Sequence, residues 1–260
     1  MLLEIISIIA LTLILNLILV KKRFLVDLQH KSKHKQLIKN NKITPLSGGL
    51  VILCSINFLS FQNILFLFTS ILILLLGILS DTDILSSPKK RILIQILIIG
   101  IFLNYSGIYF DDLRFSLLNK LLNYYPFAIL FNLFCILILI NGTNLIDGLN
   151  VSAIGYFLSI GFSLIMLTND YNLILEQNFI FILIVILSVL FIFNFFGKLF
   201  LGDGGSYLIS FIFAYILINF YTDNPSVSPY FVMCLLWYPA FENLFSILRT
   251  QFFEKNKINK

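Results

Sequence analysis

Three aspartates stand where long apolar runs of this sequence end or begin. Asp81 follows the run 64–80, Asp147 follows the run 124–140 within the motif NGTNLIDGLN, and Asp203 precedes a further run within the motif FLGDGGS. Carboxylates are costly beside an apolar phase and are retained there mainly for function. They can hold Mg²⁺ or accept a proton from a phosphate or hydroxyl nucleophile. The three aspartates therefore predict a metal-dependent site.

Asparagines accompany Asp147. Asn141, Asn144 and Asp147 recur every three residues, which places them near one face of a helix, and Asn150 ends the same motif. Amide groups in a polar break between apolar runs suit the recognition of a nucleotide and of sugar hydroxyls. A capped interhelical turn, with Asp147 or Asn150 as the N-cap, explains one of these polar residues but not all of them.

The glycines around Asp203 predict a phosphate site, since glycines before a helix leave backbone N–H groups free to bind an anion. Asp203 could anchor a metal ion that bridges those phosphates. Lys198 could add a cation, and Phe200 could offer an aromatic face to a base. Taken alone, a glycine-rich loop is a weak signal, because such turns are common.

A basic triplet, Lys89-Lys90-Arg91, opens the apolar run 92–104. A cluster of this kind beside a membrane can hold a lipid phosphate. For Lys89 and Lys90 a role as topological anchors is equally well supported. We assign Arg91 to substrate binding.

The elements that carry these residues are membrane helices. The chain is 59% hydrophobic and 12% charged, whereas soluble domains are nearer half apolar and a quarter charged. Many apolar runs approach the length of about 20 residues that crosses a bilayer, which argues against a large soluble helical protein. The net charge of +5 reflects basic loops and indicates no nucleic-acid partner.

The sequence predicts an all-α polytopic membrane protein that forms one domain over residues 1–260. Strand alternation is absent and the runs are too long for barrel strands, so each span is expected to be a helix. Nine spans are predicted, several of them short enough to imply tilt or re-entry. They are 1–20, 46–61, 64–80, 92–104, 124–140, 151–168, 178–196, 206–221 and 230–248.

The basic residues predict the orientation of these spans. Every Lys and Arg except Arg114 and Lys120 falls in one set of loops, which the positive-inside rule makes cytoplasmic. With nine spans the N-terminus lies outside and the C-terminus lies in the cytoplasm. The polar motifs, including the basic loop 21–49 that ends in Ser-Gly-Gly, then all face the cytoplasm. Asp111 and Asp112 fall on the outer side and are discounted as a catalytic pair.

The order of these motifs resembles the polyprenyl-phosphate N-acetylhexosamine-1-phosphate transferases, glycosyltransferase family 4, which include the phospho-N-acetylmuramoyl-pentapeptide transferases. GILSDTDILSSPKKR is similar to the stretch that carries the family's Asp-Asp motif, NGTNLIDGLN to its Asn-x-x-Asn-x-x-Asp-Gly motif, and FLGDGGS to its Gly-Asp-x-Gly-Ser loop. SGGL is similar to its first cytoplasmic loop. The resemblance covers essentially the whole chain.

The resemblance implies a Mg²⁺-dependent phosphotransferase in the bacterial inner membrane. It would transfer a sugar-1-phosphate from a UDP-sugar to polyprenyl (undecaprenyl) phosphate and so initiate cell-wall or surface polysaccharide synthesis. Asp203 is similar to the principal metal ligand, Asp81 to the catalytic carboxylate near the lipid phosphate, and Phe200 to the ring that stacks on uracil. Asn144 and Asp147 are similar to nucleotide-site residues, and a homodimer is compatible with the sequence.

Three features depart from the family pattern. Ser80 stands where the family has the first Asp of its pair, and Asn150 stands where it has a second Asp. The family's His-rich motif has no counterpart before Lys260, so we expect that the chain lacks the C-terminal part. Two alternatives remain open: a membrane transporter or flippase, since polar breaks in helices also build transport sites, and an inactive truncated member of the family.

Overall fold

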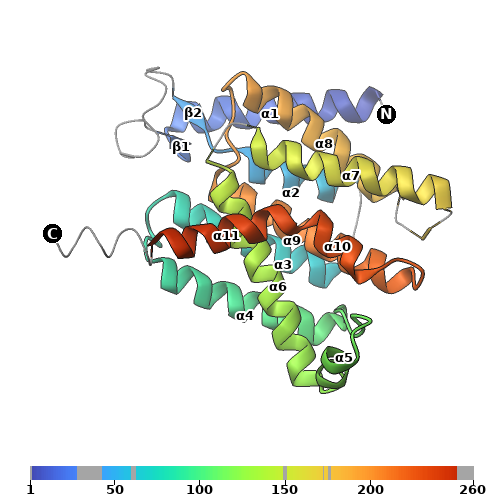
Figure 1. Cartoon of the computed structure of the whole chain (residues 1–260). Helices are drawn as coiled ribbons and strands as arrows, with labels where there is room; N and C mark the ends of the chain where they lie inside the picture. The colour runs from blue at the N-terminus through green and yellow to red at the C-terminus, as the bar shows by residue number, and fades with distance from the viewer. Residues whose placement is uncertain are drawn as a thin grey trace.

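The computed structural model of the chain describes residues 2–27, 43–59, 63–148, 151–171, 173–174 and 177–250. In this part the fold is a bundle of helices with one short antiparallel hairpin, β1 (Val26–Asp27) and β2 (Thr44–Pro45) (Figure 1). The helices are α1 (Leu2–Lys22), α2 (Gly48–Leu59), α3 (Ile64–Asp81), α4 (Pro88–Ser106), α5 (Ser116–Leu122), α6 (Tyr125–Ile146), α7 (Ser152–Tyr171), α8 (Gln177–Phe195), α9 (Gly202–Asp223), α10 (Pro229–Leu235) and α11 (Trp237–Arg249).

Each of the nine apolar runs predicted as spans contains a helix, and the last run contains two, α10 and α11. The predicted ends are wrong at two places that matter for the site. Helix α6 continues to Ile146, so that Asn141 and Asn144 belong to it. Helix α9 begins at Gly202, so that the glycine motif is its first turn and not a loop before it. The short helix α5 and the hairpin were not predicted.

An all-α membrane fold agrees with the length and composition of these helices. Among the described residues, α1, α3, α6, α8 and α9 are each long and apolar enough to cross a bilayer, and the bent pair of α10 and α11 would make a sixth span. Helix α2 has only 12 residues, and α4 carries three cations in its first turn. The number of nine spans and their orientation remain predictions.

Helix α9 is the central element of the bundle. Every residue from Gly204 to Tyr221 except Asn219 is buried, and α9 packs against α3, α6 and α2 (Figure 1). Its hydrophobic side chains form the core together with rings from neighbouring helices, such as Phe66 of α3 and Phe102 of α4 around Phe211. A helix that is apolar all round must be surrounded by other elements or by lipid, and here protein surrounds it.

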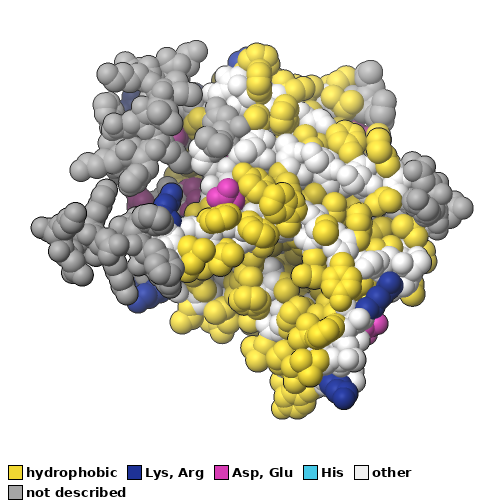
Figure 2. All heavy atoms as spheres, in the orientation of Figure 1, with side chains coloured by type: hydrophobic (Ala, Val, Ile, Leu, Met, Phe, Trp, Pro, Cys, Tyr) yellow, Lys and Arg dark blue, Asp and Glu magenta, His cyan; other side chains and the backbone are white. Residues whose placement is uncertain are grey.

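The periphery of the bundle is apolar as well. Large hydrophobic side chains cover most of the visible face, and Lys and Arg side chains gather toward its ends (Figure 2). Leu3 of α1, Ile64 of α3 and Tyr105 of α4 are each more than 70% exposed. A soluble protein rarely exposes a continuous apolar surface of this extent, so the surface is that of a protein whose solvent is lipid.

A bend of 61° separates α10 from α11. Pro239 has no N–H to donate to the carbonyl of Leu235, four residues earlier, and a proline inside a helix therefore kinks it. The Tyr156 hydroxyl donates a hydrogen bond to this Leu235 carbonyl. Gly142 of α6 faces the bend, where a Cβ atom would lie 2.0 Å from the Pro239 carbonyl oxygen. The bend is thus fixed by backbone contact with α6 and by a hydrogen bond from α7.

Asp112, which the sequence predicted to be noncatalytic, fastens the segment between α4 and α5. Its Oδ1 accepts hydrogen bonds from the Arg114 N–H at 2.6 Å and from Asn119 Nδ2 at 2.5 Å. The Arg114 guanidinium donates to the carbonyls of Pro225 and Val227, beyond the end of α9. These bonds give Asp112 a structural role at the end of the bundle away from Asp203.

Candidate active site

The site is built where α3 and α9 touch backbone to backbone. A Cβ atom on Gly77 would lie 2.3 Å from the Cα of Gly204, a distance that no side chain could occupy. Because glycine lacks Cβ, the two helices approach closely, as small residues permit in membrane proteins. Asp81 lies one turn beyond Gly77 on α3, and the close approach brings its carboxylate to the first turn of α9.

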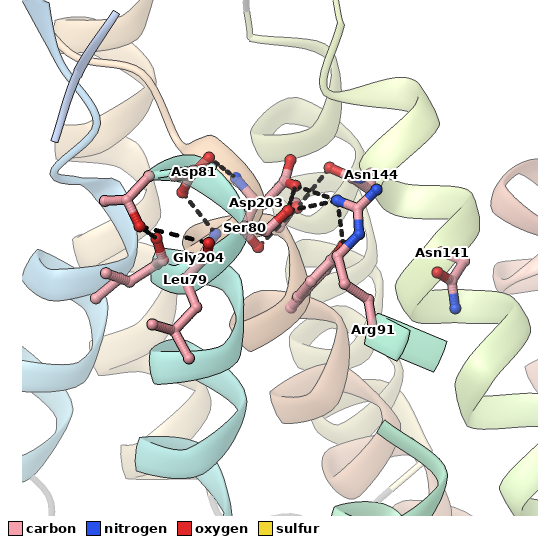
Figure 3. A network of polar contacts seen from close by, with 12 residues as sticks. Leu79, Ser80, Asp81, Arg91, Asn141, Asn144, Asp203 and Gly204 are labelled. Carbon is pink, nitrogen blue, oxygen red and sulfur yellow. Dashed lines mark hydrogen bonds and ion pairs between the residues drawn. The ribbon is translucent and has the colours of Figure 1, made fainter. Parts of the chain in front are cut away.

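Asp81 caps α9 from another helix. Its Oδ1 accepts a hydrogen bond from the Asp203 N–H at 2.9 Å, and its Oδ2 accepts one from the Gly204 N–H at 3.1 Å (Figure 3). The N-cap residue of α9 is Leu201, whose side chain makes no capping bond. A helix leaves its first N–H groups unpaired and favours negative charge at that end. The carboxylate of Asp81 supplies both the acceptors and the charge.

Gly202 makes this cap possible in two ways. Its φ of +72° lies in the left-handed region, which glycine adopts without strain. A Cβ atom at this position would lie 2.8 Å from Asp81 Oδ2. A larger residue would therefore strain the backbone and displace the carboxylate.

The sequence prediction that the N–H groups of this glycine motif are free to bind phosphate is thus wrong for two of them. The N–H groups of Asp203 and Gly204 point at Asp81. The physical reason is that a capping acceptor from a helix distant in sequence satisfies them, which a glycine pattern does not reveal.

Arg91, in the first turn of α4, forms an ion pair with Asp203. Its Nη1 lies 2.9 Å from Asp203 Oδ2, and the two side chains are only 21% and 25% exposed (Figure 3). Ser80 Oγ donates to the same Oδ2 at 2.5 Å and accepts a hydrogen bond from Arg91 Nη1. The Tyr207 hydroxyl lies 3.5 Å from that nitrogen. One guanidinium and one carboxylate thus share a nearly enclosed contact that a serine hydroxyl bridges.

Helix α6 contributes Asn144 to this cluster. Ser206 Oγ of α9 lies 3.2 Å from Asn144 Oδ1 and 3.1 Å from the Asp203 carbonyl oxygen. Asn141, one turn earlier on α6, donates through Nδ2 to Gln95 Oε1 of α4 at 3.0 Å. The interval of three between the asparagines therefore places both on a face of α6 that meets α4 and α9. In Figure 3, Asn144 lies beside the cluster and Asn141 lies further from it.

The other predicted site residues lie around this cluster. Asp147 is the half-buried C-cap of α6, one turn beyond Asn144. Lys198 is exposed, with its Nζ 6.0 Å from the centroid of the Phe196 ring. Phe200 is held through its backbone, which donates to the Pro45 carbonyl and accepts from the Gly48 N–H. Asn150 lies outside the described residues.

Four helices thus bring Ser80, Asp81, Arg91, Asn144 and Asp203 to one end of the bundle. Four participants were not assigned a role from the sequence: Ser80, Ser206, Tyr207 and Gln95. Gln95 could have been found, because it is a polar residue inside an apolar run and stands four residues after Arg91, on the same helix face. The structure buries Gln95 to 1% exposure and leaves its Nε2 without a partner among the described residues.

The donor set can be compared with what Mg²⁺ needs. Among the described residues no group of three or more His, Cys, Asp and Glu side chains could hold a metal ion. Mg²⁺ takes oxygen ligands and is often bound through one or two carboxylates together with substrate phosphates. The Asp203 carboxylate, with the oxygens of Ser80 and Asn144 in the same cluster, fits such a site only if substrate phosphates complete it.

This arrangement suits the handling of a phosphorylated ligand. Arg91 supplies a guanidinium, whose planar fork matches phosphate oxygens. Asp203 supplies a carboxylate fixed at a helix start, and Asn144 supplies an amide. All three are attached to helices and not to loops, which holds their relative positions.

Two comparisons with known proteins bear on the chain. The family model described as Glycosyl transferase family 4 matches residues 63–221, more than half of the 260 residues. The matched range contains α3, α4, α6 and all but the last two residues of α9, and with them the whole cluster around Asp203. No match is found among curated protein sequences.

Proposed function

The chain belongs to glycosyl transferase family 4, and on that premise we propose that it transfers a sugar-1-phosphate from a UDP-sugar to a polyprenyl phosphate in the membrane. The donor sugar would be an N-acetylhexosamine, and the site would face the cytoplasm of a bacterial cell. The observation that carries the proposal is the Arg91–Ser80–Asp203 contact beside Asn144, at one end of an apolar bundle. It places a guanidinium suited to phosphate beside a carboxylate suited to Mg²⁺, at the end of the bundle where we propose that the lipid phosphate binds.

The proposed reaction exchanges one phosphoanhydride bond for another. A phosphate oxygen of the polyprenyl phosphate attacks the β-phosphorus of the UDP-sugar. The bond between that phosphorus and the oxygen bridging to the α-phosphorus breaks, and UMP leaves with the bridging oxygen. The bond from the sugar to the β-phosphate stays intact, so the product is a polyprenyl-diphosphate-sugar.

The residues would act mainly by positioning and by charge, which is how phosphoryl-transfer sites gain most of their rate. Asp203, with Ser80 and Asn144, would hold Mg²⁺ at the diphosphate. When bound, Mg²⁺ would neutralise the charge that develops on the phosphate oxygens. Arg91 would bind phosphate, and Asn141, Asn150, Lys198 and Phe200 would contact the nucleotide and sugar.

The proposal gives Asp81 a positioning role, supported by its two bonds to the start of α9. Those bonds hold the backbone of Asp203, so that Asp81 acts on the reaction through its neighbour. A phosphate monoester has a second pKa of about 6 and is largely ionised at neutral pH, so the nucleophile needs little help from a base. Asp147 remains the proposed carboxylate for any direct proton transfer.

The carboxylates also bear on the alternative of a transporter. A transport site formed by broken helices lies near the midplane of the bilayer. Asp81 ends α3 and Asp203 begins α9, so the charged cluster lies at helix ends. This location favours a reaction at the membrane surface.

The test is UMP release by the purified full chain, supplied with polyprenyl phosphate and a panel of UDP-N-acetylhexosamines, with Mg²⁺ or with a chelator. UMP should appear with at least one donor and should require both the lipid phosphate and Mg²⁺. Asp203→Asn should lower the rate at least about a hundredfold, as expected when a charge-stabilising group is removed.

Asp223→Asn is the matched control, because Asp223 is an exposed residue at the opposite end of the same helix. Its rate should equal that of the unmodified chain. Unchanged UMP release in Asp203→Asn would refute the site, and no release with any donor would refute the function.

A further inference from the structure

The charges of the cluster are already paired within the protein. Both oxygens of Asp81 accept backbone N–H groups of α9. Asp203 Oδ2 holds Arg91 at 2.9 Å and Ser80 at 2.5 Å. Of the two carboxylates in the cluster, the one suited to a metal ion is therefore neutralised by a guanidinium.

The residue at position 80 determines how many carboxylates lie beside Arg91. The Ser80 hydroxyl lies between Arg91 and Asp203, donating to the carboxylate and accepting from the guanidinium. A serine is neutral, so Arg91 has one carboxylate partner here. A second carboxylate at position 80 would leave negative charge in excess beside Asp203, and a divalent cation could then bind without displacing Arg91.

A cation that approaches Asp203 must meet the Arg91 guanidinium. Like charges within a few ångströms repel strongly where solvent is largely excluded, and Arg91 and Asp203 are only 21% and 25% exposed. A guanidinium keeps its positive charge in proteins, so Arg91 relieves this repulsion only by moving away from the cation. It can only change partners, and phosphate oxygens are partners that its planar fork matches well.

We propose that Arg91 is an exchangeable counter-ion, which leaves Asp203 for the diphosphate of the nucleotide when a divalent cation binds to Asp203. The inference rests on the proposed function, because it takes a nucleotide diphosphate as the ligand. Its consequence is that the cation and the diphosphate each raise the affinity for the other, because each weakens the Arg91–Asp203 contact that the other has to break. Thermodynamic linkage requires the same coupling factor in both directions.

The experiment measures Mn²⁺ binding to the purified full chain in detergent micelles by the electron paramagnetic resonance of free Mn²⁺. Titrations are made without and with saturating UDP, and chelation of Mn²⁺ by UDP is subtracted from protein-free samples. For the unmodified chain, UDP should tighten Mn²⁺ binding at least about tenfold, within the usual range of coupling between sites. Equal Mn²⁺ affinity with and without UDP would overturn the proposal.

Two variants test the counter-ion itself. Arg91→Gln should bind Mn²⁺ at least about fivefold more tightly in the absence of UDP, and the coupling should fall toward one. Ser80→Asp keeps the guanidinium and should also gain Mn²⁺ binding without UDP, so that the test survives if Arg91→Gln does not fold. Lys90→Gln removes an exposed cation from the same turn of α4 and should keep the coupling of the unmodified chain.

The outcomes separate this inference from the proposed function. If radiolabelled UDP fails to bind in equilibrium dialysis at any Mn²⁺ concentration, the nucleotide site and the inference are both refuted. If UDP binds but Mn²⁺ affinity is independent of it, only the counter-ion exchange is refuted. The counter-ion exchange would also be refuted if Arg91→Gln and Ser80→Asp bound Mn²⁺ as weakly as the unmodified chain does.

Discussion

Replacing Asp81 by asparagine tests whether this carboxylate holds the start of α9. Asp81 offers one oxygen to the Asp203 N–H and the other to the Gly204 N–H. Asparagine keeps one acceptor and turns the other into an NH₂ group that faces a backbone donor. One charge-assisted hydrogen bond, with a strength of about 1.5–3 kcal/mol, is lost. The favourable interaction of the charge with the helix terminus, about 0.3–1 kcal/mol, is lost with it.

We therefore expect Asp81→Asn to lower the free energy of unfolding by about 2–4 kcal/mol. For a chain of this size such a loss lowers the melting temperature by roughly 4–16 °C. The measurement is thermal unfolding of the purified chain in detergent, followed by helical circular dichroism. If this variant also lost activity, the displacement of Asp203 would explain part of the loss. The loss would therefore not by itself identify Asp81 as a base.

Asp83→Asn is the matched control, since Asp83 is exposed and lies two residues beyond Asp81. It adopts a φ of +61°, a conformation that asparagine tolerates as well as aspartate does. This control should melt within about 2 °C of the unmodified chain. If Asp81→Asn melted with the control, the capping role of Asp81 would be refuted.

Two further substitutions test how the helices are held around the site. Gly77→Ala should destabilise the chain by about 3 kcal/mol, because the new Cβ would lie 2.3 Å from the backbone of α9. The control Gly100→Ala, whose Cβ would have no atom within 4 Å, should be neutral or stabilising by about 1 kcal/mol. Equal melting temperatures of the two variants would contradict the close contact between α3 and α9. Tyr156→Phe should cost about 1–3 kcal/mol by leaving the Leu235 carbonyl unpaired at the bend. The control Tyr105→Phe, on a side chain 75% exposed, should change nothing, and identical melting of the two variants would argue against the hydrogen bond from Tyr156.

The position of Asp81 could be predicted from the sequence because it depends on local composition. The apolar run 64–80 ends at Ser80, and α3 ends at the next residue, Asp81. The length of an apolar run predicts a helix, and the first polar residues after it predict where the helix ends. The same reasoning placed Arg91 at the start of α4, where Pro88 occupies the first turn.

The start of α9 could not be predicted in this way. Glycine disfavours helix interiors, so the sequence indicated a loop up to Ser206, whereas the helix begins at Gly202. The missing information is the acceptor from Asp81, which reaches α9 only because Gly77 and Gly204 allow the backbones to touch. A contact between residues more than a hundred positions apart has no signature in one sequence.

The contact between Arg91 and Asp203 was missed for the same reason. Both residues were predicted as site residues, but with separate partners, lipid phosphate for Arg91 and metal for Asp203. The structure pairs them with each other. Ser80, which the sequence presented as the absence of a carboxylate, bridges the pair through its hydroxyl.

The proposed reaction is tested most directly by following the two phosphorus atoms of the donor separately. UDP-sugar labelled with ³²P in either the α- or the β-phosphate is incubated with the full chain, polyprenyl phosphate and Mg²⁺, and the products are partitioned between butanol and water. Transfer of a sugar-1-phosphate predicts that the β-label enters the lipid phase while the α-label stays in water as UMP. If both labels stayed in water as UDP while the sugar entered the lipid phase, or if no label moved with any donor, the account would be contradicted.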